Sequence, residues 1–118
     1  MQIKLVQTLF LALMRWWPFD AKEYPKLKGK SSAEVVDFAL VHMSYHISHR
    51  AGDLARIHER HAHHRSALLD KRQRDRMKRL AARVIVSAIR LFVMAGGTPR
   101  EFVVYATRIH RRHKKVSK

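Results

Sequence analysis

The chain has 118 residues, of which 25 are lysine or arginine and nine are aspartate or glutamate, so its formal net charge is +16. A hydrophobic fraction of 47% excludes a disordered basic tail, because such tails lack apolar residues, and the length indicates a single helical domain over residues 1–118. The absence of cysteine excludes disulfides and thiolate zinc sites, and we expect a cytoplasmic protein.

Residues 1–17 predict a first helix that is apolar almost all round. One face carries Ile3, Val6, Phe10, Leu13 and Trp17, and a neighbouring face carries Leu5, Leu9, Ala12 and Trp16. A helix of this kind packs in a core, docks in a partner's groove or lies on a membrane surface. We favour packing in the protein's own core.

The same segment resembles a secretory signal peptide, because a lysine precedes a short apolar run. The run ends in Arg15-Trp16-Trp17-Pro18 and has no small-residue cleavage site. It is also too short to span a bilayer. We therefore predict neither a signal peptide nor a membrane span here.

Residues 18–31 predict a basic loop in which lysines alternate with the aromatic residues Phe19 and Tyr24. Lysines interleaved with aromatic rings suit a phosphate backbone and its bases. The alternative is a solvated loop whose aromatic rings pack into the core. The candidate phosphate contacts of this loop are Lys26, Lys28 and Lys30.

Residues 32–95 predict the central helices. Ser31-x-x-Glu34 forms a capping box that begins the first of them. The stretch from Asp53 to Ala95 holds neither glycine nor proline and is too long for one helix, so we expect a break within residues 60–66.

Residues 98–118 predict a basic C-terminal helix and tail. Gly96-Gly97 ends the preceding helix, and Thr98-Pro99-Arg100-Glu101 supplies an N-cap, a proline at the first helical position and a capping glutamate. We expect this helix to bury Phe102, Tyr105, Ala106 and Ile109 and to expose Arg108, Arg111, Arg112 and Lys115. With no strand pattern anywhere, the chain predicts an all-α fold, a compact bundle of four to five helices.

A row of arginines is the most informative functional feature of the chain. Arg72, Arg76, Arg79 and Arg83 follow one another at spacings of four, three and four, and Arg90 comes seven residues later. At about 100° per residue, all five lie in one narrow stripe of a helix. Like charges at this spacing repel one another, and a polyanion that neutralises them relieves the repulsion. We call these five residues the arginine stripe.

Charge density favours the same partner. From Lys71 to Lys118 there are 15 basic residues and only two acids, Asp75 and Glu101. Such a field attracts nucleic acid or anionic lipid. We predict a non-enzymatic protein that grips a DNA or RNA backbone, without base readout, as a small subunit of a nucleoprotein assembly with other protein subunits and no cofactor. Its predicted contacts are the arginine stripe, Lys26, Lys28, Lys30, Arg108, Arg111, Arg112 and Lys115.

Histidines form a second unusual pattern, because seven of the nine lie between residues 42 and 64. His42, His46 and His49 share one helix face, and two histidines at i, i+4 can chelate zinc. The outer pair lies about 10 Å apart along a straight helix, too far to meet on one ion. We predict no metal site and favour a stripe that contacts bases or a partner.

Two alternative functions stay open. The first is an adaptor for a membrane surface or a protein partner, anchored by the helix over residues 1–17. The second is a ribonuclease, since Arg56 with His61 and Arg108 with His113 match the R-x4-H spacing of the HEPN class of helical ribonucleases. In such a site the histidine acts as a general base and the arginine stabilises the phosphorane. The motif is permissive in a chain this rich in arginine and histidine.

Overall fold

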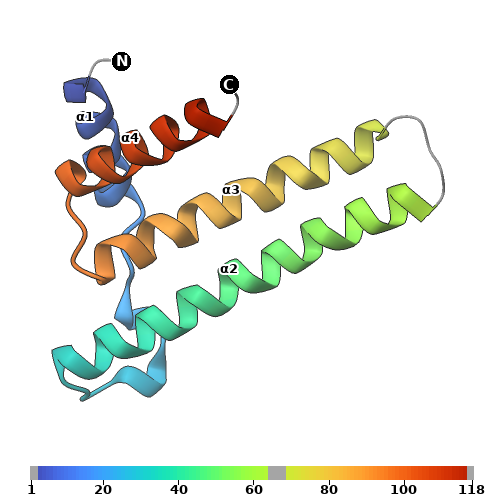
Figure 1. The fold of residues 1–118 in the computed structure, drawn as a ribbon. Helices are drawn as coiled ribbons and strands as arrows, with labels where there is room; N and C mark the ends of the chain where they lie inside the picture. Colours follow the sequence, from blue (N-terminus) through green and yellow to red (C-terminus); the bar gives the residue numbers. More distant parts are fainter. Residues whose placement is uncertain (1–2, 64–68, 117–118) are drawn as a thin grey trace.

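A computed structural model describes the backbone of residues 3–63 and 69–116, and the side chains of residues 3–59 and 69–114. Over this part of the chain there are four α-helices, two one-turn 3-10 helices and no strand (Figure 1). The predicted all-α fold is therefore confirmed. In chain order the elements are α1 (Ile3–Trp16), η1 (Ala21–Glu23), η2 (Pro25–Leu27), α2 (Ser32–His63), α3 (Lys71–Met94) and α4 (Pro99–Val116).

Reciprocal hydrogen bonds cap the two helix starts that the sequence predicts. At the start of α2 the Glu34 N–H donates to Ser31 Oγ at 3.2 Å, and the Ser31 N–H donates to Glu34 Oε1 at 3.4 Å. At the start of α4 the Glu101 N–H donates to Thr98 Oγ1 and the Thr98 N–H donates to Glu101 Oε1, both at 3.2 Å. Each box satisfies backbone donors that the first turn leaves unpaired, so both predicted starts are confirmed.

The start of α3 uses a capping box that the sequence analysis missed. The Gln73 N–H donates to Asp70 Oδ1 at 2.7 Å, and the Asp70 N–H donates to Gln73 Oε1 at 3.0 Å. The end of α2 at His63 falls inside the predicted break at residues 60–66. At the other end of α3, Gly96 has a φ of 88°, a left-handed conformation that glycine adopts without steric strain.

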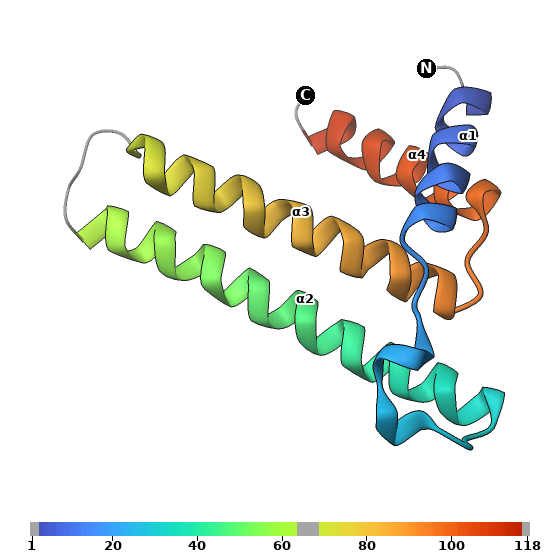
Figure 2. The same cartoon turned by 180° about the vertical axis from the view of Figure 1, so that it is seen from behind.

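The two longest helices, α2 and α3, form an antiparallel hairpin. Its free end extends well away from α1 and α4, which pack against each other near the other end (Figures 1 and 2). The molecule measures 52 × 37 × 22 Å along its principal axes. We call the distal part of this hairpin, residues 50–63 of α2 and 71–80 of α3, the hairpin arm. Along the hairpin α2 and α3 contact each other, whereas α1 packs against α4 and α3 (Figure 1).

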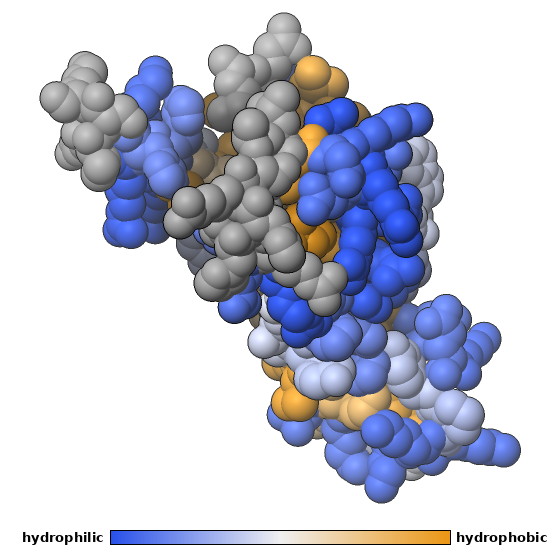
Figure 3. Space-filling view, turned by 90° about the vertical axis from the view of Figure 1, so that its right-hand side faces the viewer, coloured by the Kyte–Doolittle hydropathy of each residue, from blue (hydrophilic) through white to orange (hydrophobic). Residues whose placement is uncertain are grey.

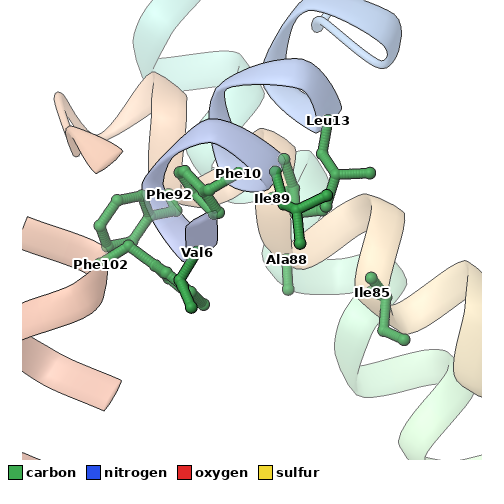
Figure 4. Close-up of a pocket in the computed structure, with 9 residues that line it drawn as sticks. Val6, Phe10, Leu13, Ile85, Ala88, Ile89, Phe92 and Phe102 are labelled. Carbon is green, nitrogen blue, oxygen red and sulfur yellow. The ribbon is translucent and has the colours of Figure 1, made fainter. Parts of the chain in front are cut away.

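An aromatic cluster holds α1, α3 and α4 together. Phe10 of α1 is 4% exposed; its ring stacks on Phe102 of α4 at 4.3 Å between centroids and meets Phe92 of α3 edge-on at 5.4 Å. The rings approach one another beside a largely apolar groove between α1 and α3 (Figure 4). Ring pairs of this geometry add stability beyond the area that they bury.

The outer side of α1 differs from the predicted core helix, because Phe10 is the one residue of α1 that the structure buries. Leu9 is 56% exposed and Trp16 is 71% exposed, and Ile3 and Leu5 are exposed as well. The prediction was right about the Phe10 side. It was wrong about Ile3 and about the neighbouring face, because the hairpin extends away from α1 and leaves its outer side uncovered.

The predicted core face of α4 also needs correction. Tyr105 is 48% exposed and Ile109 is 57% exposed, whereas Val103 is buried. Phe102 stacks on Phe10 of α1, and Val103 lines a groove together with Ile3 and Gln7 of α1. Past this contact Tyr105 still meets the Phe92 ring at 6.3 Å between centroids, but the apolar side chains of α4 become more exposed toward Ile109.

Candidate nucleic-acid interface

The outer part of the arginine stripe lies on the hairpin arm. Arg72, Arg76 and Arg79 are exposed on α3, as is Arg83, the next member of the stripe. Among the side chains that the structure describes, none of these four forms an ion pair with a carboxylate. The stripe is therefore a row of unneutralised guanidinium groups on one side of a helix.

Residues 71–80 of α3 carry further basic side chains away from the stripe, and two of these side chains already have partners within the protein. Lys78 Nζ lies 3.0 Å from Asp75 Oδ1, and Arg74 Nη1 donates to the Leu69 carbonyl at 2.6 Å. Lys71 is exposed as well, about 100° round the helix from Arg72. The acid nearest the stripe in sequence, Asp75, is thus paired with a lysine of the opposite side and does not neutralise the stripe.

The last residue of the stripe, Arg90, is partly covered by other elements of the protein. Arg90 is half-buried, and its Nε donates to the Trp17 carbonyl at 3.2 Å. This hydrogen bond ties the segment after α1 to α3, so Arg90 has a structural contact in addition to any ligand contact. Helix periodicity places Arg90 on the stripe correctly, but it does not predict that other elements cover this part of the face.

A cleft between α2 and α3 lies beside this end of the stripe. Its volume is about 370 Å³, and arginines reach it from both helices: Arg50 from α2, and Arg83 and Arg90 from α3. We call it the α2–α3 cleft. Its lining residues are Tyr24, Met43, His46, Arg50, Ala82, Arg83, Val86, Ser87 and Arg90. Arg50 was not predicted, because in the sequence it lies more than thirty positions from the arginines that it joins in space.

One buried carboxylate organises the α2 side of this region. Asp53 is buried and lies 3.8 Å from Arg50 and 3.9 Å from His49, and it accepts a hydrogen bond from Arg56. A buried carboxylate needs such cationic partners to offset its lost hydration. Since its one negative charge is shared between Arg50 and Arg56, Asp53 leaves the surroundings of the cleft positively charged.

His46, which lines the cleft, contacts the neighbouring ring of His42. Their Nε2 atoms lie 3.0 Å apart, and the His42 ring stacks on Phe38 at 5.0 Å between centroids. Burial, together with the positive field of His42, Arg50, His49 and Arg90, lowers the pKa of His46 below its ordinary value. Within the described residues, no group of three histidine, aspartate or glutamate side chains is placed to hold a metal ion.

The lowered pKa of His46 predicts a loss of stability in acid. Because the unfolded chain binds the His46 proton at a higher pH than the folded protein, the free energy of unfolding falls as the pH drops below about 6.5. His46→Gln should reduce the difference in stability between about pH 7 and pH 5, measured by urea unfolding. An unchanged difference in His46→Gln contradicts the prediction.

The basic loop over residues 18–31 contacts α2 through two of its lysines. Lys26 Nζ lies 4.6 Å from the centroid of the Phe38 ring, a cation–π contact, and Lys30 Nζ lies 3.7 Å from Glu34 Oε2. Lys28 is exposed. The rings of Phe19 and Tyr24 stack at 5.3 Å and are half-buried against Phe38. In the structure the aromatic rings of this loop pack onto the protein, which is the second of the two alternatives considered from the sequence.

The α4 residues form a third group. Arg108, Arg111 and Arg112 are exposed, and the side chain of Lys115 lies outside the described residues. Arg108 and Arg111 line a groove with Ile3 of α1. The predicted contacts thus lie on three elements: the stripe on α3, the lysines of the loop before α2, and the arginines of α4. Seen from the free end of the hairpin, hydrophilic side chains cover most of the described surface (Figure 3).

The two R-x4-H segments lie on different helices. Arg56 is on the hairpin arm and donates to Asp53, and the side chain of His61 lies outside the described residues. Arg108 and His113 are exposed on α4. The contact with Asp53 gives Arg56 a structural role that the spacing of the motif does not predict.

No family model, no curated protein and no solved structure matches this chain. No helix among the described residues has the length and apolar character needed to cross a bilayer.

Proposed function

We propose that this protein binds the sugar-phosphate backbone of nucleic acid through the outer part of the arginine stripe, which lies on its hairpin arm. The observation that supports the proposal best is the exposed row of Arg72, Arg76 and Arg79, which lacks carboxylate partners among the described residues. From Arg72 to Arg83 the helix rises roughly 16 Å, which matches about five base pairs of a duplex. Guanidinium groups suit this ligand because their planar donors bind phosphate oxygens in pairs.

The proposed role is non-enzymatic and tolerant of sequence. Phosphate contacts position a protein on nucleic acid, whereas base-edge contacts specify sequence. The stripe consists of long cations on an open surface, and this arrangement favours the backbone. A place in a larger nucleoprotein assembly and a cytoplasmic location remain predictions from the sequence.

A salt titration tests the proposal directly. If about six phosphates are contacted, the affinity for a mixed-sequence duplex should fall by roughly 10³-fold between about 50 and 200 mM salt, because counterions compete for the phosphates. Fluorescence anisotropy with labelled duplexes of two unrelated sequences measures both the slope and the tolerance of sequence. A slope near zero, or no binding at low salt, contradicts the proposal.

A second candidate function is docking of a partner on the outer side of α1, and the exposure of Leu9 and Trp16 favours it. Large apolar side chains exposed close together mark interaction sites more often than isolated ones do. This candidate ranks second because α1 already has a structural role: Phe10 packs against Phe92 and Phe102.

A further inference from the structure

The α2–α3 cleft combines an excess of positive charge with a partly apolar interior. Arg50 shares the carboxylate of Asp53 with Arg56 and His49. Among the described residues, no carboxylate lies within ion-pair distance of Arg83 or Arg90. The Nε of Arg90 is used by the Trp17 carbonyl, so its two terminal nitrogens remain as donors for a ligand.

The rest of the lining is suited to a flat apolar group. Met43 is buried beneath the cleft, Val86 and Ala82 come from the facing turns of α3, and Tyr24 adds an aromatic wall with a hydroxyl. Small-molecule sites generally have a mainly apolar lining with a few polar groups that fix the orientation of the ligand. The volume of about 370 Å³ lies within the range of such sites.

Arginines on two facing helices favour a phosphate group over a carboxylate. A phosphate offers more acceptor oxygens, and planar guanidinium groups can approach it from different sides at once. His46 and Ser87 add donors beside them. A base or another flat ring then covers the apolar lining, which would otherwise stay in contact with water.

We propose that the α2–α3 cleft binds a nucleoside 5′-phosphate, with the phosphate on Arg50, Arg83 and Arg90 and the base against Met43 and Val86. The nucleoside phosphate is either a free nucleotide or one nucleotide of a single strand. If it belongs to a strand, the inference rests on the proposed function. A paired and stacked base in a duplex does not fit the cleft, so a duplex contacts the outer stripe residues Arg72, Arg76 and Arg79 and leaves the cleft empty.

Calorimetric titration with adenosine 5′-monophosphate, adenosine and inorganic phosphate tests the cleft. The monophosphate should bind at least about tenfold more tightly than either fragment, since each supplies only part of the contacts. Arg83→Gln should weaken binding of the monophosphate by about tenfold or more, because it removes a charged donor. Arg74→Gln, on the opposite side of α3, should change it less than about twofold. Melting curves of both variants establish that they are folded.

Four results overturn the inference: no binding of the monophosphate, adenosine binding as tightly as the monophosphate, inorganic phosphate binding as tightly as the monophosphate, or equal losses in Arg83→Gln and Arg74→Gln. The third result refutes the role of the apolar lining. If oligodeoxyadenylate competes with the monophosphate and loses affinity in Arg83→Gln, the ligand is a nucleotide of a strand; without competition, it is a free nucleotide. Salt-dependent binding of a duplex is measured separately, so the cleft can fail while the backbone proposal stands.

Discussion

Replacing Arg72, Arg76 and Arg79 together by glutamine should weaken nucleic-acid binding on the order of 10²-fold at about 0.1 M salt. Each lost phosphate contact also lowers the slope of log affinity against log salt by about 0.9, so the triple variant should lose about 2.7 from the slope. The fold should be unaffected, because these side chains are exposed and lack ion-pair partners among the described residues. Anisotropy titrations at several salt concentrations and a melting curve provide the measurements.

The hairpin arm offers a charge-matched control. Lys71, Arg74 and Lys78 are exposed on the same helix segment about 100° or more round the helix from Arg72, and replacing them by glutamine removes the same three charges. If the stripe is the interface, this control should lose less than about tenfold, the part that long-range attraction contributes. Equal losses in the two triple variants mean that net charge matters and position does not. A triple variant that unfolds shows that Arg72, Arg76 and Arg79 are structural.

Helix ends were the part of the fold that local sequence predicted best. Ser31 with Glu34, and Thr98 with Glu101, form capping boxes in the structure because the hydrogen bonds involve residues only three positions apart. Asp70 with Gln73 has the same pattern, and applying the rule to aspartate as well as serine and threonine predicts the start of α3. Such local signals do not depend on the packing of distant elements.

Long-range contacts were harder to predict. Periodicity put Arg90 on the same stripe as Arg76, but one is half-buried against the Trp17 carbonyl and the other is exposed. Periodicity likewise gave Tyr105 a place on a core face, but its side chain is 48% exposed and its ring meets the edge of Phe92 at 6.3 Å between centroids. A hydrophobic pattern specifies which side of a helix is apolar, but neighbouring elements decide how much of that side is buried.

Of the candidate site, the sequence predicted the part that lies within one helix and missed the part that lies between two helices. Residues of the stripe lie within one helix, so their common face follows from helix geometry alone. The α2–α3 cleft joins Arg50 to Arg83 and Arg90, and only the pairing of the two long helices brings these residues together. A basic residue on the facing helix is no different in the sequence from any other arginine of this arginine-rich chain.

The two sides of α1 should respond very differently to the loss of a side chain. Phe10→Ala removes a buried ring that contacts Phe92 and Phe102, and it should lower the free energy of unfolding by about 3–5 kcal/mol. Leu9→Ala, at a neighbouring position that is 56% exposed, should cost less than about 1 kcal/mol, because little apolar surface is uncovered. Urea unfolding of the two variants measures both values.

These two variants also separate the roles of α1. If α1 belongs to the core through Phe10 alone, Phe10→Ala should melt at least about 10 °C below the wild-type protein, whereas Leu9→Ala should melt within a few degrees of it. A small effect of Phe10→Ala means that α1 detaches without harm to the other helices, which makes the docking function the better reading. A large effect of Leu9→Ala means that a second copy of the chain or another element covers the outer side in solution. Sedimentation analysis of the wild-type protein distinguishes these two causes, since a second copy doubles the mass.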